Sequence, residues 1–322
     1  MTLKSAVRNW SSGIRTTTEK LLNAVQRPDA YREVVVSSAG SPIVLSVWDG
    51  KPDQAAVVFL PGTMTHPLFY EEFLDALNRN GVNVVGVHHQ AHGKSPRTRK
   101  PLTFTTLVTN ARDAVAWTRH EFPRCPVAVV GSSQGGIVAV ALAAVGDDCD
   151  VVIAHNILDP SLASSIEITR FPGWLRCVYP AVVGVIRTGG RFAPWIPVPF
   201  SMYLDIGRVC RDQVNAEYFF TDPLGRRTYP LGFMASLFGA DLSGMRDGSI
   251  TCPIVVIAGR SDPLFPLAYT RRVYASIVAP RKELVVVEST VHLLFNEDLD
   301  TALPPILERL SQLSSARLPA PS

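Results

Sequence analysis

Ser133 stands at the centre of a G-x-S-x-G pattern, written GSSQG at residues 131–135. An apolar run at residues 125–131 precedes the pattern, and another at residues 134–146 follows it. This order predicts a strand, a tight turn and a helix, with the serine hydroxyl exposed at the turn as a nucleophile. Glycine on both sides also suits a turn that serves packing alone. The neighbouring Ser132 stands one residue too early for the nucleophile position.

An acid and a base must accompany the serine, because its hydroxyl is a weak nucleophile until a base removes the proton. Asp262 follows the apolar run at residues 252–259, and His292 follows the run at residues 282–288. Catalytic groups of open α/β sheets gather at the carboxyl ends of strands, and the order Ser, acid, His suits a strand–turn–helix nucleophile. We therefore predict that His292 accepts the serine proton and that Asp262 orients the imidazole. Asp159 is the second candidate for the acid.

The oxyanion that develops during attack on a carbonyl needs backbone N–H donors. Gln134, the residue after the nucleophile, is expected to supply one of them. The second is expected from the turn that follows Gly62, where glycine lets the backbone approach closely. Thr63 is the first candidate in that turn and Met64 the alternative. An ordinary Pro-Gly turn without a catalytic role is the competing interpretation.

Short apolar runs alternate with helical patterns along most of the chain. The predicted strands span residues 31–38, 41–50, 54–62, 82–89, 125–131, 150–157, 252–259 and 282–288. The predicted helices span residues 69–81, 103–122, 134–146, 266–279 and 298–313. Apolar strands that alternate with helices indicate an α/β fold with a doubly wound, mostly parallel sheet, here of eight strands. The first two strands read as a hairpin at an antiparallel edge.

The alternation stops between residues 159 and 249, where proline, glycine and aromatic residues are scattered. Because the sheet pattern resumes afterwards, we predict an inserted cap at residues 159–249. The core would then comprise residues 29–158 and 250–322. Residues 1–28 would form an N-terminal arm, which has an amphipathic pattern and no signal-peptide core.

Composition argues against several classes of protein. The net charge is +3 and no run of Lys or Arg forms a basic stripe, so we expect no nucleic-acid partner. Five cysteines without paired spacing predict free thiols in a reducing cytoplasm. His88 and His92 are four residues apart, but no acidic residue lies close by, so we expect neither a metal nor a cofactor. No segment reaches the roughly 20 apolar residues of a membrane span.

Five stretches together resemble the α/β-hydrolase fold, and more narrowly its monoacylglycerol lipase and lysophospholipase branch. They read PGTMTHPLFYEEFLDAL, AHGKS, GSSQGG, AGRSDPLFP and VHLLFNE. The resemblance covers most of residues 30–158 and 250–316. Pro61 and Ser132 stand where the family pattern has histidine, which removes neither of the two expected oxyanion donors. Ala91 replaces the first glycine of the family's G-H-G turn, so that turn is open to a different conformation.

The resemblance implies a serine hydrolase that cleaves a carboxylic ester through an acyl-enzyme intermediate, with residues 159–249 as a cap over the serine. It implies a lipophilic small-molecule substrate such as a monoacylglycerol or a lysophospholipid. Apolar side chains suit an acyl chain, and we expect Met64, Trp174, Phe192 and Trp195 to contact it. The apolar stretch at residues 174–187 would also suit a transient peripheral contact with a membrane surface.

The same constellation leaves other reactions open. Thioesterases, amidases, C–C hydrolases and acyltransferases use the same three residue types. A protein that keeps this fold only to bind a ligand is the alternative outside enzymes. Epoxide hydrolases and haloalkane dehalogenases are disfavoured, because they use aspartate where this chain has Ser133.

Overall fold

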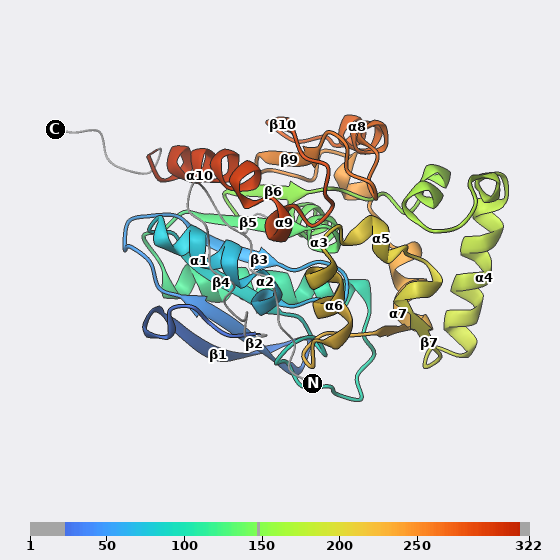
Figure 1. Ribbon diagram of the computed structural model, residues 1–322, viewed down its shortest axis with the longest axis horizontal. Helices are drawn as coiled ribbons and strands as arrows, with labels where there is room; N and C mark the ends of the chain where they lie inside the picture. The colour runs from blue at the N-terminus through green and yellow to red at the C-terminus, as the bar shows by residue number, and fades with distance from the viewer. Residues whose placement is uncertain (1–22, 147–148, 316–322) are drawn as a thin grey trace.

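The computed structural model describes residues 23–146 and 149–315, and one eight-stranded sheet forms its centre (Figure 1). The strands are β1 (Tyr31–Ser38), β2 (Ser41–Trp48), β3 (Ala56–Leu60), β4 (Asn83–His88), β5 (Val127–Ser132), β6 (Val151–His155), β9 (Ile254–Gly259) and β10 (Lys282–Val287). They lie in the order β1-β2-β4-β3-β5-β6-β9-β10. The pairs β1–β2 and β2–β4 are antiparallel, and the other pairs are parallel. The predicted mostly parallel sheet with an antiparallel hairpin at its edge is confirmed.

Helices cover both faces of this sheet. One face carries α1 (Glu71–Arg79), α9 (Leu294–Glu297) and α10 (Leu299–Ser315), and the other carries α2 (Phe104–Glu121), α3 (Gln134–Ala143) and α8 (Leu267–Ser276). Successive side chains of a strand point to opposite faces. In β3, Val57 and Phe59 therefore join the first apolar layer, whereas Val58 and Leu60 join the second. Both layers are apolar, which is why these strands read as continuous apolar runs.

The cap lies between β6 and β9. It contains η3 (Ala163–Ile168), η4 (Gly173–Val178), α4 (Tyr179–Phe192), β7 (Pro197–Pro199), η5 (Phe200–Met202), α5 (Ile206–Val209), α6 (Gln213–Thr221), β8 (Thr228–Pro230), α7 (Leu231–Phe238) and η6 (Ser243–Met245). Helices α4 and α7 pack together beyond the end of the sheet (Figure 1). Their backbones come close at Gly190, where a Cβ atom would lie 2.3 Å from the Cβ of Ala235. The limits 159 and 249, and those of the core, stay predictions.

The end of the predicted N-terminal arm is fixed to α1. Most of the arm, with its amphipathic pattern, lies outside the described residues, which begin at Asn23. The backbone N–H of Gln26 donates to Glu71 Oε1 at 2.8 Å, and Arg27 Nε lies 2.6 Å from Asp75 Oδ1. Two short 3-10 helices, η1 (Pro28–Ala30) and η2 (Pro67–Tyr70), precede β1 and α1.

The five cysteines are free thiols, although two of them are neighbours in space. Cys149 and Cys252 precede β6 and β9, and their buried sulfur atoms lie 3.7 Å apart. No helix within residues 23–146 and 149–315 combines the length and the apolar character that crossing a bilayer requires.

Candidate active site

Ser133 occupies the turn between β5 and α3, with φ of +51° and ψ of −112°. A side-chain-bearing residue adopts this conformation rarely, and such strain gathers at functional sites. The flanking glycines are required by space. A Cβ at Gly131 would lie 2.2 Å from the Gly135 carbonyl oxygen, and a Cβ at Gly135 would lie 2.0 Å from that of Leu60. The GSSQG pattern therefore reflects a turn in which only glycine fits on both sides of the serine.

The structure brings Ser133, His292 and Asp262 into one hydrogen-bonded chain. His292 Nε2 lies 3.1 Å from Ser133 Oγ, and His292 Nδ1 lies 3.0 Å from Asp262 Oδ2. A carboxylate only accepts hydrogen bonds, so the proton of a neutral imidazole sits on Nδ1 and leaves Nε2 free to accept the serine proton. The ring of Phe265 stacks on the imidazole at 5.4 Å between centroids. The imidazole is thus held in the orientation that a general base requires.

Asp262 is stabilised as a carboxylate by several donors. Its Oδ1 accepts from the backbone N–H groups of Leu264 and Phe265 at 2.7 and 2.9 Å, and its Oδ2 accepts from the Asn156 amide at 2.8 Å. Burial alone would raise the pKa of Asp262, but His292 and the backbone donors lower it below its usual value. The sequence analysis missed Asn156. Its position directly after β6 was the available signal, because that strand ends beside the one that leads to Asp262.

Asp159 has different partners from Asp262. Arg246 donates to its Oδ2, and Ser161 donates to its Oδ1 through both the backbone N–H and the hydroxyl. Asp159 lies where the chain enters the cap, and Arg246 lies near its exit. This ion pair therefore joins the two connections between cap and core, and the carboxyl that reaches the imidazole is that of Asp262.

The two residues expected to form the oxyanion hole, Gln134 and Thr63, line the same cavity as Ser133. Gln134 is the first residue of α3, so its N–H has no partner within the helix. Thr63 lines that cavity together with Ser133 and Gln134. A Cβ at Gly62 would lie 2.7 Å from the Tyr70 hydroxyl oxygen, so glycine is needed where this turn approaches the nucleophile. Both predicted donors therefore lie beside the serine.

Met64, the alternative oxyanion donor and an expected substrate contact, is otherwise engaged. Its backbone N–H donates to the Tyr229 hydroxyl oxygen at 3.0 Å, and its side chain is buried in the core. Its φ of +62° lies in the left-handed region. Among these neighbours Thr63 keeps the role of candidate donor, and the Met64 side chain packs away from the cavity lining.

Comparison with known proteins shows the family of this chain. Residues 51–299 match the family Hydrolase_4, described as serine aminopeptidase, S33. The chain belongs to this S33 hydrolase family. A monoacylglycerol lipase of Mycolicibacterium smegmatis is 28% identical over 264 residues, which cover 80% of this chain and 88% of the relative. This S33 hydrolase is therefore an α/β hydrolase of the esterase and lipase type, on the branch that resembles monoacylglycerol lipases.

Solved structures share the fold of this S33 hydrolase. The crystal structure of a Paleococcus ferrophilus monoacylglycerol lipase superimposes with a TM-score of 0.66 at 20% identity, over 85% of this chain and 98% of that one. A soluble variant of monoglyceride lipase from Saccharomyces cerevisiae, in complex with a substrate analogue, gives 0.68 at 14% identity, over 92% and 98% of the two chains. At these identities the likeness establishes the α/β-hydrolase fold.

The cavity at Ser133 in this S33 hydrolase is narrow and largely apolar. It encloses about 70 Å³. Besides Ser133, Gln134 and Thr63, its lining consists of Ile137, Leu158, Ser165, Ile168, Thr169, Tyr203, Leu204, Met234, Leu237, Phe238, Leu264 and Phe265. Most of these come from the cap or its connections to the core, so the cap forms the cavity roof. The hydroxyl oxygen of Tyr203 is buried and has no hydrogen-bond partner among the described residues.

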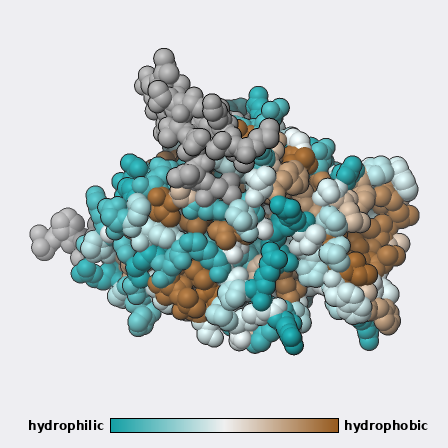
Figure 2. Space-filling view, turned by 60° about the horizontal axis from the view of Figure 1, so that its bottom comes forward, coloured by the Kyte–Doolittle hydropathy of each residue, from teal (hydrophilic) through white to brown (hydrophobic). Residues whose placement is uncertain are grey.

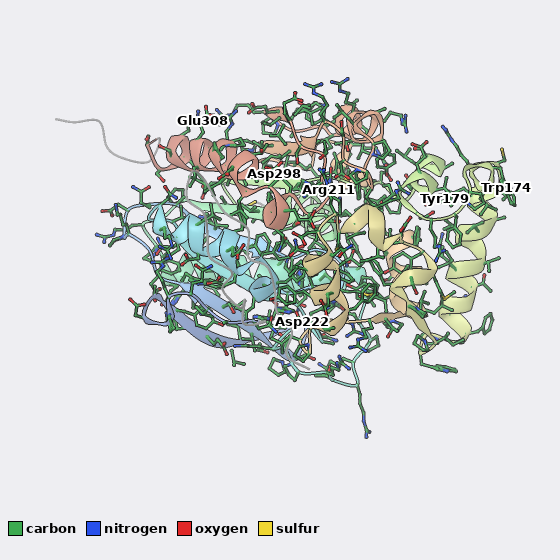
Figure 3. All side chains as sticks on the ribbon, in the orientation of Figure 1. Trp174, Tyr179, Arg211, Asp222, Asp298 and Glu308 are labelled. Carbon is green, nitrogen blue, oxygen red and sulfur yellow. The ribbon has the colours of Figure 1, made fainter. Side chains whose placement is uncertain are left out.

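The three aromatic residues expected to contact substrate lie elsewhere on the S33 hydrolase. Trp174, Phe192 and Trp195 have exposed fractions of 69%, 74% and 74%, and none lines the cavity. Figure 3 shows Trp174 at the outer end of the cap, near the start of α4. The cavity is instead lined mainly by aliphatic residues and by three aromatics that the sequence did not single out as substrate contacts, Tyr203, Phe238 and Phe265. Apolar character alone does not say which face of a cap element a residue occupies.

The histidines at the end of β4 and just after it pack inside the S33 hydrolase core. His88 Nε2 lies 2.9 Å from the Ser46 hydroxyl, and its Nδ1 accepts from the Lys94 N–H. His92 Nδ1 lies 2.9 Å from the carbonyl oxygen of Gln90, and its Nε2 lies 2.9 Å from the Tyr229 hydroxyl. In the part of the chain that the structure describes, no group of three His, Cys, Asp or Glu side chains is arranged to hold a metal ion.

Proposed function

We propose that this protein is a serine hydrolase that cleaves a lipophilic carboxylic ester, such as a monoacylglycerol or a lysophospholipid, through an acyl-enzyme intermediate. The observation that carries the proposal is the hydrogen-bonded chain Ser133–His292–Asp262, whose serine lines a cavity together with Gln134 and Thr63. A nucleophile, a general base with its orienting acid, and an oxyanion site are the parts that acyl transfer requires.

The mechanism uses each of these parts in turn. His292 Nε2 takes the proton of Ser133 Oγ as that oxygen bonds to the ester carbonyl carbon. The resulting oxyanion accepts hydrogen bonds from the Gln134 and Thr63 N–H groups. The tetrahedral intermediate collapses, the C–O bond to the alcohol breaks, and His292 returns its proton to the departing alkoxide. Water then repeats the sequence on the acyl-enzyme, releases the carboxylic acid and restores the serine.

The cavity lining supports an apolar acyl group. Aliphatic side chains of α3, the cap and the connections between them surround the space beside Ser133. Its volume of about 70 Å³ is well below the roughly 300 to 1,000 Å³ of sites that bind drug-sized ligands. We propose that the cap shifts away from the core to admit an acyl chain. The Mycolicibacterium smegmatis relative named a monoacylglycerol lipase supports the choice of ester.

The outer face of the cap supports transient contact with a lipid surface. Exposed apolar side chains gather there, and Figure 2 shows them at the cap end of the molecule. They include Trp174, Val178, Val185, Phe192, Trp195 and Ile196. Residues 168–204 contain four arginines and no acidic residue, which suits anionic lipid headgroups. The free thiols favour a reducing compartment, and we propose a cytoplasmic enzyme that visits membranes.

Active-site labelling combined with a substrate panel tests the proposal. The wild-type chain should react with a fluorophosphonate probe and hydrolyse esters of graded acyl length, and the Ser133→Ala variant should do neither. Absence of labelling, or equal labelling of Ser133→Ala, would overturn the triad. The panel also includes matched thioesters, amides and an alcohol acceptor. Faster turnover on one of those would replace ester hydrolysis by the thioesterase, amidase or acyltransferase alternative.

A further inference from the structure

A segment of the cap holds the turn that carries the predicted oxyanion donor. We call residues 222–229 the cap strap and residues 62–66 the oxyanion turn. The Tyr229 hydroxyl oxygen accepts from the Met64 N–H at 3.0 Å, and the backbone N–H of Arg226 donates to the Met64 carbonyl oxygen at 2.9 Å. Both backbone groups of one residue in the oxyanion turn are therefore bonded to the cap.

A second contact lies two residues further along the oxyanion turn. His66 Nε2 lies 2.7 Å from Asp222 Oδ2, and both side chains are buried. Figure 3 shows Asp222 at the end of α6, on the side where the cap meets the core. Burial alone would raise the pKa of Asp222, but His66 and Asn23 lower it below its usual value, so the carboxyl is an ionised acceptor. The cap strap is therefore hydrogen-bonded to the oxyanion turn at Met64 and at His66.

These contacts bear on the direction of the Thr63 N–H. On one side, the carbonyl oxygen of Gly62 accepts from the backbone N–H and the hydroxyl of Thr65, at 3.2 and 2.9 Å. A trans peptide is planar, so the Thr63 N–H points opposite to that carbonyl. On the other side, the cap strap fixes Met64, whose left-handed φ of +62° is costly for a residue with a side chain. The donor therefore sits between two anchored peptides.

The direction of the Tyr229 hydroxyl proton follows from its contact with His92. His92 Nδ1 faces the Gln90 carbonyl oxygen, which only accepts, so Nδ1 carries the proton of the neutral ring. Burial lowers the pKa of His92 well below its usual value, so Nε2 is an acceptor for the hydroxyl proton at 2.9 Å. The lone pairs of the hydroxyl oxygen then face the Met64 N–H. The Gln134 side-chain oxygen lies 3.2 Å from the same hydroxyl.

We propose that Tyr229 of the cap is a positioning residue for the oxyanion hole, which it sets through the hydrogen bond that its hydroxyl oxygen accepts from the Met64 N–H. This inference rests on the proposed function, because it assigns a role within the same reaction. Tyr229 touches neither the nucleophile nor the carbonyl carbon. It acts on Met64, the residue next to the candidate donor Thr63, and it makes an ordered cap part of the catalytic apparatus.

Tyr229→Phe tests the inference, because it removes the hydroxyl and keeps the ring that packs on Phe233 at 4.1 Å between centroids. We expect kcat for p-nitrophenyl butyrate to fall about tenfold or more, since loss of an entire donor costs roughly a hundred- to a thousandfold. KM should change less than about twofold, because the contact acts in the transition state. Hydrogen exchange of the Met64 amide should accelerate, because its acceptor is gone.

Tyr179→Phe is the matched control. Tyr179 is a buried cap tyrosine whose hydroxyl donates to the Pro160 carbonyl oxygen at 2.7 Å, away from the oxyanion turn. It should keep wild-type kcat and Met64 exchange at a comparable loss of thermal stability. Should Tyr229→Phe fail to fold, His92→Leu should lower kcat in the same way, and His92→Gln, which keeps an acceptor near Nε2, should restore most of it.

The proposed function and the positioning role of Tyr229 can be overturned independently of each other. Wild-type turnover that disappears in Ser133→Ala supports the proposed function, and unchanged kcat and Met64 exchange in Tyr229→Phe would then overturn the positioning role alone. A wild-type chain that neither labels nor hydrolyses would overturn the proposed function. The Met64 exchange rates would still decide whether the cap strap holds the turn.

Discussion

Large apolar side chains are exposed more often in the cap than in the core. In the core, Trp48, Phe59 and Phe73 are fully buried between the sheet and its helices. In the cap, Trp174 and Trp195 are mostly exposed. A close-packed core holds side chains in fixed positions, and exposed apolar groups invite contact with something outside the chain. The proposed function places bond breaking in the core, and the exposed side chains suit a role for the cap in access to the site.

Two aspartates show how differently equivalent sequence positions are used, because each of them follows a strand of the core. Asp262 serves the imidazole, whereas Asp159 binds Arg246 and ties the two ends of the cap together. The surroundings of the two aspartates distinguish their roles, although their positions in the sequence do not. A carboxylate bonded to a histidine and to backbone donors is poised for catalysis, and one bonded to an arginine is a structural anchor.

Asp262→Asn should have the largest effect of the substitutions considered. The amide favours the wrong imidazole tautomer and does not stabilise the imidazolium, so we expect kcat to fall about a thousandfold or more. Steady-state hydrolysis of the ester measures this loss of kcat. Asp159→Asn should keep kcat within about tenfold and lower the melting temperature, because it weakens one ion pair. A larger loss of kcat in Asp159→Asn than in Asp262→Asn would make Asp159 the catalytic acid and Asp262 the structural anchor.

The exposed cap face should matter for lipid surfaces and not for chemistry. The double variant Trp174→Asp, Trp195→Asp should lose about tenfold or more in binding to vesicles that contain anionic lipid, because charge replaces the apolar contact. Turnover of a soluble short-chain ester should stay near the wild-type rate. Vesicle co-sedimentation and hydrolysis of the soluble ester measure the two properties.

Val145→Asp provides the control for that variant, since Val145 is an exposed apolar residue of the core with a similar exposed fraction of 65%. It should leave vesicle binding unchanged. Equal loss of binding in both variants would show a general charge effect and remove the cap face as the lipid contact.

Much of the fold and of the reacting groups could be predicted from sequence, for a physical reason. The strands are apolar on both sides, and Ser133, Asp262 and His292 each follow the end of one of them within five residues. Local spacing is therefore enough to bring these side chains to one edge of the sheet. The glycines of the GSSQG turn add a steric requirement that is visible in the letters alone.

The rest depends on contacts between residues far apart in the chain. Met64 and Thr63 are equivalent in sequence, and it is the hydroxyl of Tyr229, 165 positions away from Met64, that engages one amide and leaves the other as the candidate donor. The cap aromatics pose the same difficulty. Their apolar character is shared by residues that line the cavity and residues that face outward, so Trp195 could not be told from Phe238 before the cap was folded.

Acid should destabilise the core through buried neutral histidines. Burial lowers the pKa of His89 to about 4 and that of His155 to about 3. The unfolded chain therefore binds more protons than the folded one between about pH 6.5 and 4, and stability rises with pH across that window. From pH 7 to pH 5, each histidine should remove about 2 kcal/mol from the free energy of unfolding. The lowered pKa of Asp262 acts below this window, because its stabilising effect fades only as pH falls through that lower value.

Urea unfolding at pH 5, 6 and 7 measures this slope. Burial also lowers the pKa values of His88 and His92, so His89→Leu removes one of four such groups and should make the slope shallower by about a quarter, whatever its effect on stability at pH 7. An unchanged slope in His89→Leu would mean that this side chain is protonated in the folded core, and the cause of acid sensitivity would then lie elsewhere in the molecule.

The smallest effect on stability is expected in the turn at residues 89–93 of the core, which the cap strap contacts through Arg226. Ala91 has φ of +60°, and its carbonyl oxygen accepts from the Arg226 guanidinium at 2.7 Å. The turn thus keeps a glycine-like conformation with alanine in place, held from the cap. Ala91→Gly relieves the strain and should raise the free energy of unfolding by about 0.5 to 1 kcal/mol in urea denaturation.

Gly93→Ala, in the same turn, should act in the opposite direction and more strongly. Its φ is +54°, and a Cβ there would lie 2.0 Å from His88 Nδ1. If Ala91→Gly were instead destabilising, the Arg226 contact would depend on the alanine restricting the backbone. The junction between core and cap would then need a stiff turn on the core side, in addition to the hydrogen bonds that the cap supplies.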